Sequence, residues 1–444
     1  MFEDTIAAVS TSMLSAGAIS IVRLSGKDCF DVLNRVFQSR TREYEGYRIY
    51  YGHIVDPQNG ETVDEVLVST FLAPHSFTGE NMAEINCHGG LYVTRRILTL
   101  LLACGARQAV NGEFTKRAFL NGRIDLTQAE AINDLITADS HGSARLAVNS
   151  LSGTVSRLLG PLISDLEQVI AHIEVNIDYP EYDDNGVITA EEIRPLMDDW
   201  ISRCQRILET AESTQIIREG IRTVIVGKPN VGKSSLLNAL LAEDKAIVSE
   251  YAGTTRDLVE GDIHLKNVTL HLIDTAGIHE SEDYVESIGI QKSLQALDRA
   301  QLVIVILDGS APLDRQDREI LERTEGKNRI VVYNKADIEK REGEICVSAL
   351  NGDISQLTDR INEMFARNQL ALEQPSLTNE RQISLMRQAR ENIIQARSQI
   401  DGGVPLDLVS EYIQAAYRCL REILGQYARE DLLDGIFSRF CVGK

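Results

Sequence analysis

The sequence predicts a multidomain chain: an α+β N-terminal domain, then an α-helical bundle domain that carries an inserted α/β P-loop domain. Three observations predict this arrangement. Short β-like runs alternate with helical segments up to about residue 111, helical periodicity dominates two later stretches, and a phosphate-loop motif at residues 227–234 lies between those stretches. A chain of 444 residues has room for about three such domains, each with a buried core.

The predicted N-terminal domain covers residues 1–118. Residues 18–23 and 64–71 are rich in β-branched and apolar side chains, as expected of strands, whereas residues 92–103 show a helical pattern. This alternation of short strands with helices favours a separate α+β domain.

The predicted helical bundle has two parts, residues 119–216 and residues 375–444. Each part keeps the apolar spacing of an amphipathic helix. The apolar positions are Leu162, Leu166, Val169, Ile170 and Ile173 in the first part, and Leu406, Val409, Ile413, Ala416, Leu420 and Ile423 in the second. Because surface loops tolerate an insertion whose ends are close together, the two parts predict one bundle interrupted by a domain at residues 217–374.

The inserted domain begins with a phosphate-binding loop. Residues 227–234 (GKPNVGKS) follow an apolar run at 222–226 and precede a helical pattern at 234–241. In such a loop the glycines allow successive backbone N–H groups to point at the β- and γ-phosphates of a nucleotide. Lys233 adds positive charge there, and the Ser234 hydroxyl is placed to bind Mg²⁺.

Further elements of a guanine-nucleotide switch follow in order. Residues 253–257 (GTTRD) offer Thr255 as a second Mg²⁺ hydroxyl, and residues 270–277 (LHLIDTAG) end a strand near the metal. Residues 334–337 (NKAD) supply a carboxylate that accepts hydrogen bonds from guanine, whereas adenine would leave it unpaired. Residues 348–350 fit the loop that closes over the base. The alternatives are an ATPase or a decayed nucleotide site, but the full set of motifs predicts a GTPase.

One position departs from many GTPases. A Gln often follows the Gly of the DTAG motif and orients the attacking water, but this chain has Ile278. Hydrolysis must therefore be organised by other groups. The carboxylates in residues 281–286 (SEDYVE) are candidates, and Arg256 is a conceivable internal arginine finger. The simpler interpretation of both is a solvated surface charge.

Composition excludes several classes of protein. Lys and Arg total 45 against 66 Asp and Glu, a formal charge of −21, which argues against a protein that coats nucleic acid through bulk electrostatics. The seven cysteines form no C-x-x-C pair, so neither a disulfide framework nor a zinc site is indicated. No apolar run reaches about 18 residues and the start of the chain lacks a basic segment, so we expect a cytoplasmic protein with no membrane association.

Several further motifs lie outside the GTPase region. They are residues 4–8 (DTIAA), 74–80 (PHSFTGE), 87–90 (CHGG), 112–119 (GEFTKRAF), 126–130 (LTQAE), 178–181 (DYPE) and 440–444 (FCVGK). Together they resemble the MnmE (TrmE) family of tRNA-modification GTPases, and the resemblance covers essentially the whole chain.

The resemblance implies a specific activity. Such a protein dimerises through its N-terminal domain and forms a heterotetramer with an FAD-dependent partner, MnmG. The complex installs an aminomethyl or carboxymethylaminomethyl group at the 5-position of the wobble uridine of certain tRNAs. The one-carbon donor is 5-formyl- or 5,10-methylene-tetrahydrofolate, which makes the N-terminal domain of the folate-binding type.

The resemblance also assigns cations and a catalytic acid. Potassium falls on Asn230, Ser249, Tyr251 and Thr254, and Mg²⁺ falls on Ser234 and Thr255. A monovalent cation that bridges the phosphates would replace an arginine finger. Glu286 is the implied water-orienting residue when two GTPase domains meet, and Lys233 is the second catalytic residue of this site.

The GTP site as predicted combines all five motifs. It comprises Asn230, Val231, Gly232, Lys233, Ser234, Ser235, Ser249, Glu250, Tyr251, Ala252, Gly253, Thr254, Thr255, Asp274, Thr275, Ala276, Gly277, Asn334, Lys335, Ala336, Asp337, Ser348, Ala349 and Leu350. By resemblance, the tetrahydrofolate ligands are Arg23, Glu80, Arg123 and Lys444. Cationic groups suit the glutamate carboxylates of a folate, and an acid such as Glu80 suits the amino edge of the pterin.

Cys441 is the third predicted catalytic residue. Its thiol either acts on a one-carbon intermediate or on uracil, or helps to position the site; the alternative is a simple packing role. Two other functions compete with tRNA modification. A ribosome-assembly GTPase would be expected to carry a basic RNA-binding appendage, which is not evident here. A folate-sensing regulatory GTPase would share every motif and is harder to distinguish.

Overall fold

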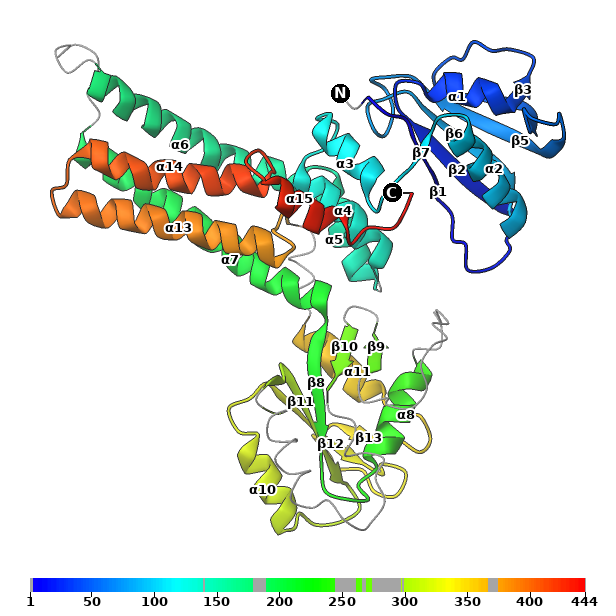
Figure 1. Ribbon diagram of the computed structural model, residues 1–444. Coiled ribbons are helices and arrows are strands. Elements are labelled where there is room, and N and C mark those ends of the chain that lie inside the picture. Colours follow the sequence, from blue (N-terminus) through cyan, green and yellow to red (C-terminus); the bar gives the residue numbers. More distant parts are fainter. Residues whose placement is uncertain are drawn as a thin grey trace. The chain divides into compact units, whose positions relative to one another are not determined.

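The computed structural model describes residues 3–138, 140–178, 189–243, 261–265, 269–273, 297, 299–365 and 374–443 (Figure 1). The chain divides into two compact units. Unit 1 joins Met1–Asn133 to Tyr417–Lys444, and unit 2 is the continuous segment Asp134–Ala416. Each unit has its own core and is described by itself.

Unit 1 contains a seven-stranded sheet with the order β3-β4-β5-β6-β2-β1-β7. Neighbouring strands are antiparallel except for the parallel pair of β1 and β7. The strands are β1 (Ile6–Val9), β2 (Ile19–Ser25), β3 (Phe37–Ser39), β4 (Arg48–Val55), β5 (Thr62–Phe71), β6 (Met82–His88) and β7 (Arg107–Gln108). Helices α1 (Cys29–Val36) and α2 (Leu91–Ala103) share a hydrophobic core with the sheet. This part has the predicted α+β character.

One face of the unit 1 sheet is covered by the two helices, whereas the other is covered at β1 by Phe77 and Phe114 and is open along β4 and β5. Along β5, Val66 and Val68 are buried in the core with the two helices, whereas Leu67 between them is exposed. Tyr51 of β4 pairs with Leu67 in the register and is also exposed, as is Ile49 two residues earlier. Because side chains alternate between the faces of a strand, these exposed residues lie on the open face.

Three further helices and the end of the chain pack in unit 1. They are α3 (Glu113–Leu120), the first part of α4 (Leu126–Thr137) and α15 (Glu430–Phe437). Phe437 stacks against Phe119 and Phe440, with ring centroids 6.4 and 5.3 Å apart. Lys116 of α3 bonds Asp434 of α15 over 2.6 Å. Segments from both ends of the sequence thus share one core.

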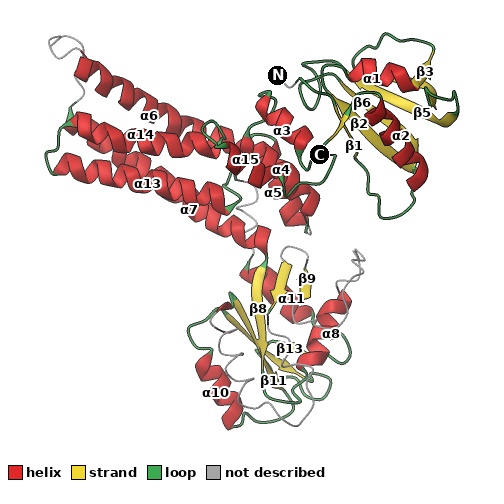
Figure 2. Ribbon diagram, viewed as in Figure 1, coloured by secondary structure: helices red, strands yellow, loops and turns green. Residues whose placement is uncertain are grey.

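Unit 2 begins and ends with long helices (Figure 2). They are α5 (His141–Leu151), α6 (Thr154–Asp178), α7 (Ala190–Glu219), α13 (Glu380–Asp401) and α14 (Leu406–Ile423), whose last residues belong to unit 1. The predicted apolar stripe of α6 is buried at Leu162, Leu166, Val169 and Ile173, as are Val409 and Ile413 of α14. Trp200 of α7 is also buried, and its indole N–H donates to the Leu162 carbonyl over 3.0 Å.

The segment between α7 and α13 in the sequence forms a six-stranded sheet with the order β13-β12-β11-β8-β10-β9. The strands are β8 (Ile221–Val226), β9 (Gly261–His264), β10 (Thr269–Leu272), β11 (Leu302–Asp308), β12 (Arg329–Asn334) and β13 (Cys346–Val347), and only β9 runs antiparallel to its neighbour. Helices α8 (Lys233–Glu243) and α11 (Ser355–Met364) share one core with the sheet, and α10 (Arg315–Arg323) packs on the other face. Successive β11 residues belong alternately to these two cores, as in a parallel sheet covered on both faces.

The α/β domain is inserted into the helical part, as predicted. Thr214 near the end of α7 and Ser376 shortly before α13 are both buried, and their hydroxyls lie 2.9 Å apart. The chain therefore leaves and re-enters the helical part at one place. The boundaries at residues 118, 216 and 374 stay predictions. Within the described segments, no helix has the length and apolar character needed to cross a membrane.

Candidate functional site

The phosphate loop follows β8 and leads into α8, whose first residue is Lys233. Two of its glycines cannot be replaced by larger residues. A Cβ on Gly227 would lie 2.5 Å from the Ile306 carbonyl oxygen, and a Cβ on Gly232 would overlap the side-chain nitrogen of Asn334. Gly232 also has a φ of 98°, in the left-handed region that favours glycine. The close packing of this loop against β11 and β12 explains why the motif has glycine at positions 227 and 232.

Lys233 and Ser234 occupy the first turn of α8. The Lys233 ammonium donates to the carbonyls of Gly227 and Lys228 over 2.7 and 3.0 Å, and burial lowers its pKa. The N-terminus of a helix carries partial positive charge and N–H groups that bind phosphate oxygens. Together with the Ser234 hydroxyl, an oxygen ligand of the kind that Mg²⁺ prefers, this end of α8 fits a magnesium-bound nucleotide phosphate.

Asn334 joins the phosphate loop to the predicted base loops. Its side-chain nitrogen donates to the Val231 carbonyl over 2.8 Å, and its side-chain oxygen accepts from the Ala349 N–H over 3.0 Å. Only 4% of Asn334 is exposed. Three of the predicted motifs therefore meet at one buried amide.

The base-recognition side chains lie just beyond Asn334. Ser348 donates its hydroxyl to the Asp337 carboxylate over 2.7 Å, which orients that exposed carboxylate. Lys335, at a φ of 68°, bonds Asp308 at the end of β11 over 2.5 Å. Ala349 is buried and Leu350 is exposed. An oriented carboxylate beside this loop is the acceptor that guanine requires.

Lys228 is a residue of the phosphate loop whose role the sequence analysis missed. Its ammonium bonds Asp314 and Asp317 over 2.7 and 2.8 Å, and hydrogen bonds from these two carboxylates raise its pKa. Asp314 and Asp317 also form the capping box that starts α10. The ion pair therefore attaches the loop to that helix. The capping pattern was visible in the sequence, but nothing there indicated its cationic partner.

Part of the predicted nucleotide site lies outside the described residues. This applies to Ser249, Glu250, Tyr251, Ala252, Gly253, Thr254, Thr255, Asp274, Thr275, Ala276, Gly277 and Glu286, as well as to Lys444 of the predicted folate site. Of the predicted potassium ligands, the structure describes Asn230, which is exposed and has a φ of 63°. Asn tolerates this left-handed conformation better than most residues.

In unit 1, Arg23 lies within β2, and its side chain contacts the end of the chain. Its guanidinium donates twice to Glu84, over 3.0 and 2.7 Å, and once to the Gly443 carbonyl over 3.0 Å. Its Cζ lies 5.7 Å from the ring centre of Phe77 and 5.5 Å from that of Phe114. The guanidinium is thus held firmly and is adjacent to the residue that precedes Lys444.

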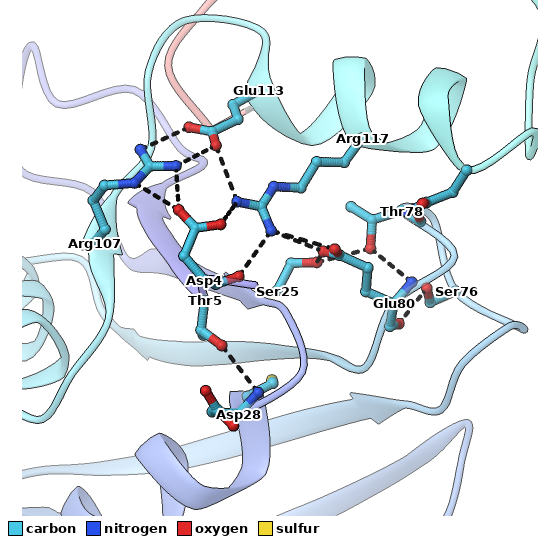
Figure 3. Close-up of polar contacts among 12 residues, drawn as sticks. Asp4, Thr5, Ser25, Asp28, Ser76, Thr78, Glu80, Arg107, Glu113 and Arg117 are labelled. Atoms are coloured by element: carbon cyan, nitrogen blue, oxygen red, sulfur yellow. Dashed lines mark hydrogen bonds and ion pairs between the residues drawn. The ribbon is translucent and has the colours of Figure 1, made fainter. Parts of the chain in front are cut away.

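Glu80 belongs to a buried ionic cluster around Arg117 (Figure 3). Arg117, in α3, has no exposed surface and bonds Glu80, Glu113 and Asp4. Ser25 donates its hydroxyl to Glu80 over 2.8 Å. Figure 3 shows the Glu80 carboxylate turned toward Arg117 and Ser25. Its predicted contact with a pterin stays a prediction, and Arg117 is a central residue that the sequence analysis quoted only within a motif.

Burial and hydrogen bonding act in opposite directions on the acids of this cluster. Burial alone would raise the pKa values of Asp4 and Glu113, but hydrogen bonds from Arg107 and Arg117 hold both below their ordinary values. Arg107 bonds both acids, Asp4 over 2.7 Å and Glu113 over 2.5 Å. Both carboxylates are therefore charged at neutral pH.

The remaining predicted residues of unit 1 are Arg123 and Cys441. Arg123 donates to the Ser76 carbonyl over 3.4 Å, and Ser76 bonds the Glu80 backbone over 2.6 Å, so Arg123 and Glu80 share one loop. Cys441 is exposed, and all seven cysteines are free thiols. No group of three or more His, Cys, Asp or Glu in the described part of the chain could hold a metal ion.

Comparison with known proteins decides the family. Residues 5–123 match the model for the GTP-binding protein TrmE N-terminus, and residues 126–441 match that for the MnmE helical domain. The tRNA modification GTPase MnmE of Lactobacillus delbrueckii subsp. bulgaricus is 46% identical over 99% of this chain and 98% of its own length. The chain belongs to the MnmE family of tRNA modification GTPases. The MnmE proteins of Streptococcus pyogenes serotype M28 and Streptococcus sanguinis, at 46% and 45% identity over 99% of the chain, agree.

Membership in the MnmE family confirms the predicted fold class and enzyme class: the chain is a GTP hydrolase. Solved structures add little. Era bound to MgGDPNP and nucleotides 1506–1542 of 16S ribosomal RNA is 26% identical, covers 39% of this chain and 66% of its own, and has a TM-score of 0.26. The FeoB G-domain of Methanococcus jannaschii is 22% identical, covers 33% and 97%, and has a TM-score of 0.24. At such TM-scores these likenesses carry no argument.

Proposed function

We propose that this GTPase acts in tRNA modification and is stimulated by potassium. With an FAD-dependent partner of the MnmG type, it installs the aminomethyl or carboxymethylaminomethyl group at the 5-position of the wobble uridine of certain tRNAs, using a tetrahydrofolate one-carbon donor. The observation that carries the proposal is the 46% identity over nearly the full length of proteins named tRNA modification GTPases. The joined phosphate and base loops support the GTPase half of it.

In this mechanism the phosphate loop binds GTP through its N–H groups, and Lys233 together with the N-terminus of α8 balances phosphate charge. Ser234 and Thr255 would hold Mg²⁺, and the side-chain oxygen of Asn230 would contribute to a potassium site. When bound, potassium would supply, beside Mg²⁺, the positive charge that an arginine finger supplies in other GTPases. Glu286 orients the attacking water, a role that Ile278 cannot perform.

The folate half of the proposal rests on Arg23, Glu80, Arg123 and Lys444. Three contacts support a common site. Arg23 bonds the carbonyl of the residue before Lys444, Glu80 bonds Ser25 two residues from Arg23 on the same strand, and Arg123 bonds the loop that carries Glu80. The cations suit the glutamate carboxylates of the cofactor, and Cys441 is close in sequence to Lys444.

For the partners, we propose a homodimer that uses the open face of the unit 1 sheet, an MnmG-type protein that completes a heterotetramer, and tRNA. Ile49, Tyr51 and Leu67 expose 67%, 58% and 48% of their surface on neighbouring positions of that face. Neighbouring exposed apolar side chains of this kind are typical of protein interfaces. The seven free thiols favour the cytoplasm, where thiols stay reduced.

The test is mass analysis of wobble nucleosides in tRNA from cells that lack this protein, complemented with variants. The wild-type chain should restore the modified uridine, whereas Lys233→Ala, which cannot balance phosphate charge, should not. Cys441→Ser should hydrolyse GTP normally yet leave the uridine unmodified. Unchanged wobble uridine in the deletion strain would overturn the proposal and favour ribosome assembly or folate sensing instead.

A further inference from the structure

The end of the chain is held against the first two strands of unit 1. We call residues 440–443 the tail. The Gly443 carbonyl accepts two hydrogen bonds, from the Ser10 hydroxyl over 3.1 Å and from the Arg23 guanidinium over 3.0 Å. Ser10 directly follows β1, and Arg23 lies within β2. One backbone oxygen of the tail therefore accepts hydrogen bonds from the end of β1 and from β2.

The backbone of the tail fits this position closely. Gly443 has a φ of 91°, in the left-handed region that disfavours other residues. A Cβ at Gly443 would overlap the Val9 carbonyl oxygen and would lie 2.9 Å from the Ser10 Cα. Only glycine brings the carbonyl within reach of both donors. This geometry explains why the terminal motif has a glycine at position 443.

Arg23 is fixed before it contacts the tail. Its paired bonds to Glu84 use two of its nitrogens, two phenyl rings flank it, and only 14% of its side chain is exposed. A guanidinium held by two hydrogen bonds to one carboxylate oxygen loses little further freedom when it makes a third bond. The remaining nitrogen, Nη1, is the one that holds the Gly443 carbonyl.

The tail is also attached on the other side of Cys441. Phe440 is buried against Phe437, and the Gly112 N–H donates weakly to the Cys441 carbonyl over 3.4 Å. Cys441 itself stays exposed, whereas five of the other cysteines are buried and Cys419 is half-buried. The exposed thiol is therefore flanked by two anchored residues, Phe440 and Gly443.

We propose that Ser10, Arg23 and Glu84 form a carbonyl clamp that positions the tail, and with it Cys441, for the one-carbon chemistry. Ser10 and Glu84 are then positioning residues for that reaction, and Arg23 holds the tail in addition to its proposed contact with the cofactor. This inference rests on the proposed function for its chemical purpose, but the clamp itself is a property of unit 1. The competing interpretation is that Arg23 serves only as a direct ligand of the cofactor.

Tail mobility can be measured without cofactor, partner or tRNA. A nitroxide spin label on Cys441, in a Cys419→Ala background, reports motion of the tail in the full-length protein. In the wild-type clamp we expect an immobilised spectrum. Loss of one hydrogen bond should raise the mobile fraction about two- to tenfold, so Ser10→Ala and Gly443→Ala should both show that rise. Ser12→Ala is the matched control, because that hydroxyl is exposed and accepts a weak bond from the Leu14 N–H over 3.4 Å, away from the tail.

Conservative variants separate positioning from charge. Ser10→Thr retains the hydroxyl and should restore the immobilised spectrum. Arg23→Lys retains the charge but lacks the planar fork, so it should release the tail. In the complementation assay, Ser10→Ala and Gly443→Ala should reduce wobble-uridine modification at saturating folate, and potassium-stimulated GTP hydrolysis should stay at the wild-type rate, which also shows that unit 2 is folded.

The two proposals fail in different ways. A spectrum that stays immobilised in both Ser10→Ala and Gly443→Ala would overturn the clamp, whatever the tRNA contains. Normal modification by variants whose tail is mobile would overturn its role in positioning. Absence of any tRNA change in cells without this protein would overturn the proposed function, and the spin-label result would still stand for the clamp.

Discussion

Asn334 donates its side-chain amide to the carbonyl of Val231, which joins the base-recognition motif to the phosphate loop over 2.8 Å. The same side chain accepts from the Ala349 N–H, so one buried amide connects three loops. The two ends of the nucleotide site are therefore joined through one side chain.

The first prediction concerns this connection. Asn334→Ala should weaken GTP binding about tenfold or more, because it leaves the Val231 carbonyl and the Ala349 N–H without their partner. Titration with a fluorescent GTP analogue measures the change. Asn351→Ala, an exposed residue near the same loop, is the control. Gly232→Ala should act like Asn334→Ala, because its Cβ overlaps the amide nitrogen. Normal affinity in both variants would contradict the connection.

The second prediction concerns potassium. GTP hydrolysis should be faster in potassium than in sodium, and Asn230→Ala should remove that difference while GTP still binds through the loop N–H groups and Lys233. Because Asn230 has a positive φ, Asn230→Gly is a useful second variant: it relieves backbone strain and also lacks the amide. Hydrolysis rates in the two salts test this. Equal hydrolysis rates of the wild-type protein in the two salts would contradict the potassium site.

A third prediction concerns Glu286, which lies outside the described residues. Glu286→Ala should lower the hydrolysis rate about 100-fold with little change in GTP affinity, because a group that orients water acts mainly on the transition state. Single-turnover hydrolysis and nucleotide titration separate the two effects. Glu282→Ala, a neighbouring acid, is the control. If Glu286→Ala hydrolyses GTP normally, another acid of that segment must orient the water.

The fourth prediction concerns the ionic cluster. Arg117→Met should destabilise unit 1 by about 3–5 kcal/mol, because it leaves the carboxylates of Glu80 and Glu113 buried without their shared cation. Arg107→Met should cost only about 0–1 kcal/mol, since 47% of the Arg107 side chain is exposed. Denaturant unfolding compares the variants, and GTP hydrolysis checks that unit 2 is intact. Similar losses in both variants would contradict the central role of Arg117.

The fifth prediction is a pH dependence. The pKa values of Asp4 and Glu113 are lowered in the folded protein, so their contribution is complete above the unfolded values of 3.8 and 4.5. It is lost as the pH falls through the lower folded values. Unit 1 should therefore lose stability below about pH 4.5, and Arg107→Met, which removes the largest pKa-lowering hydrogen bond of both acids, should show a flatter curve. Unfolding measured between pH 3 and 6 tests this, and parallel curves would refute it.

Local patterns predicted much of the molecule. The phosphate loop, the NKAD motif and the insertion of one domain into another each leave a continuous trace in the sequence, in glycine spacing or helical periodicity. The contacts that complete the sites do not. Lys228 meets Asp317 across 89 positions and Ser10 meets Gly443 across 433, and no local spacing encodes pairs so distant. Arg117 was visible within a motif, but its burial depends on segments that only the fold brings together.

Unit 1 joins two segments that are far apart in the sequence, and this affects when its parts can fold during synthesis. The ribosome makes Asp134–Ala416 before it reaches the helix and tail that complete the packing around Phe119 and Phe437. At about 5–20 residues per second this interval lasts on the order of tens of seconds. Unit 2 and the sheet core of unit 1, which lies within residues 7–106, have time to fold during translation, whereas the packing of Phe119 against Phe437 waits for α15; a chain that stops before α15 should therefore lack only that part of unit 1.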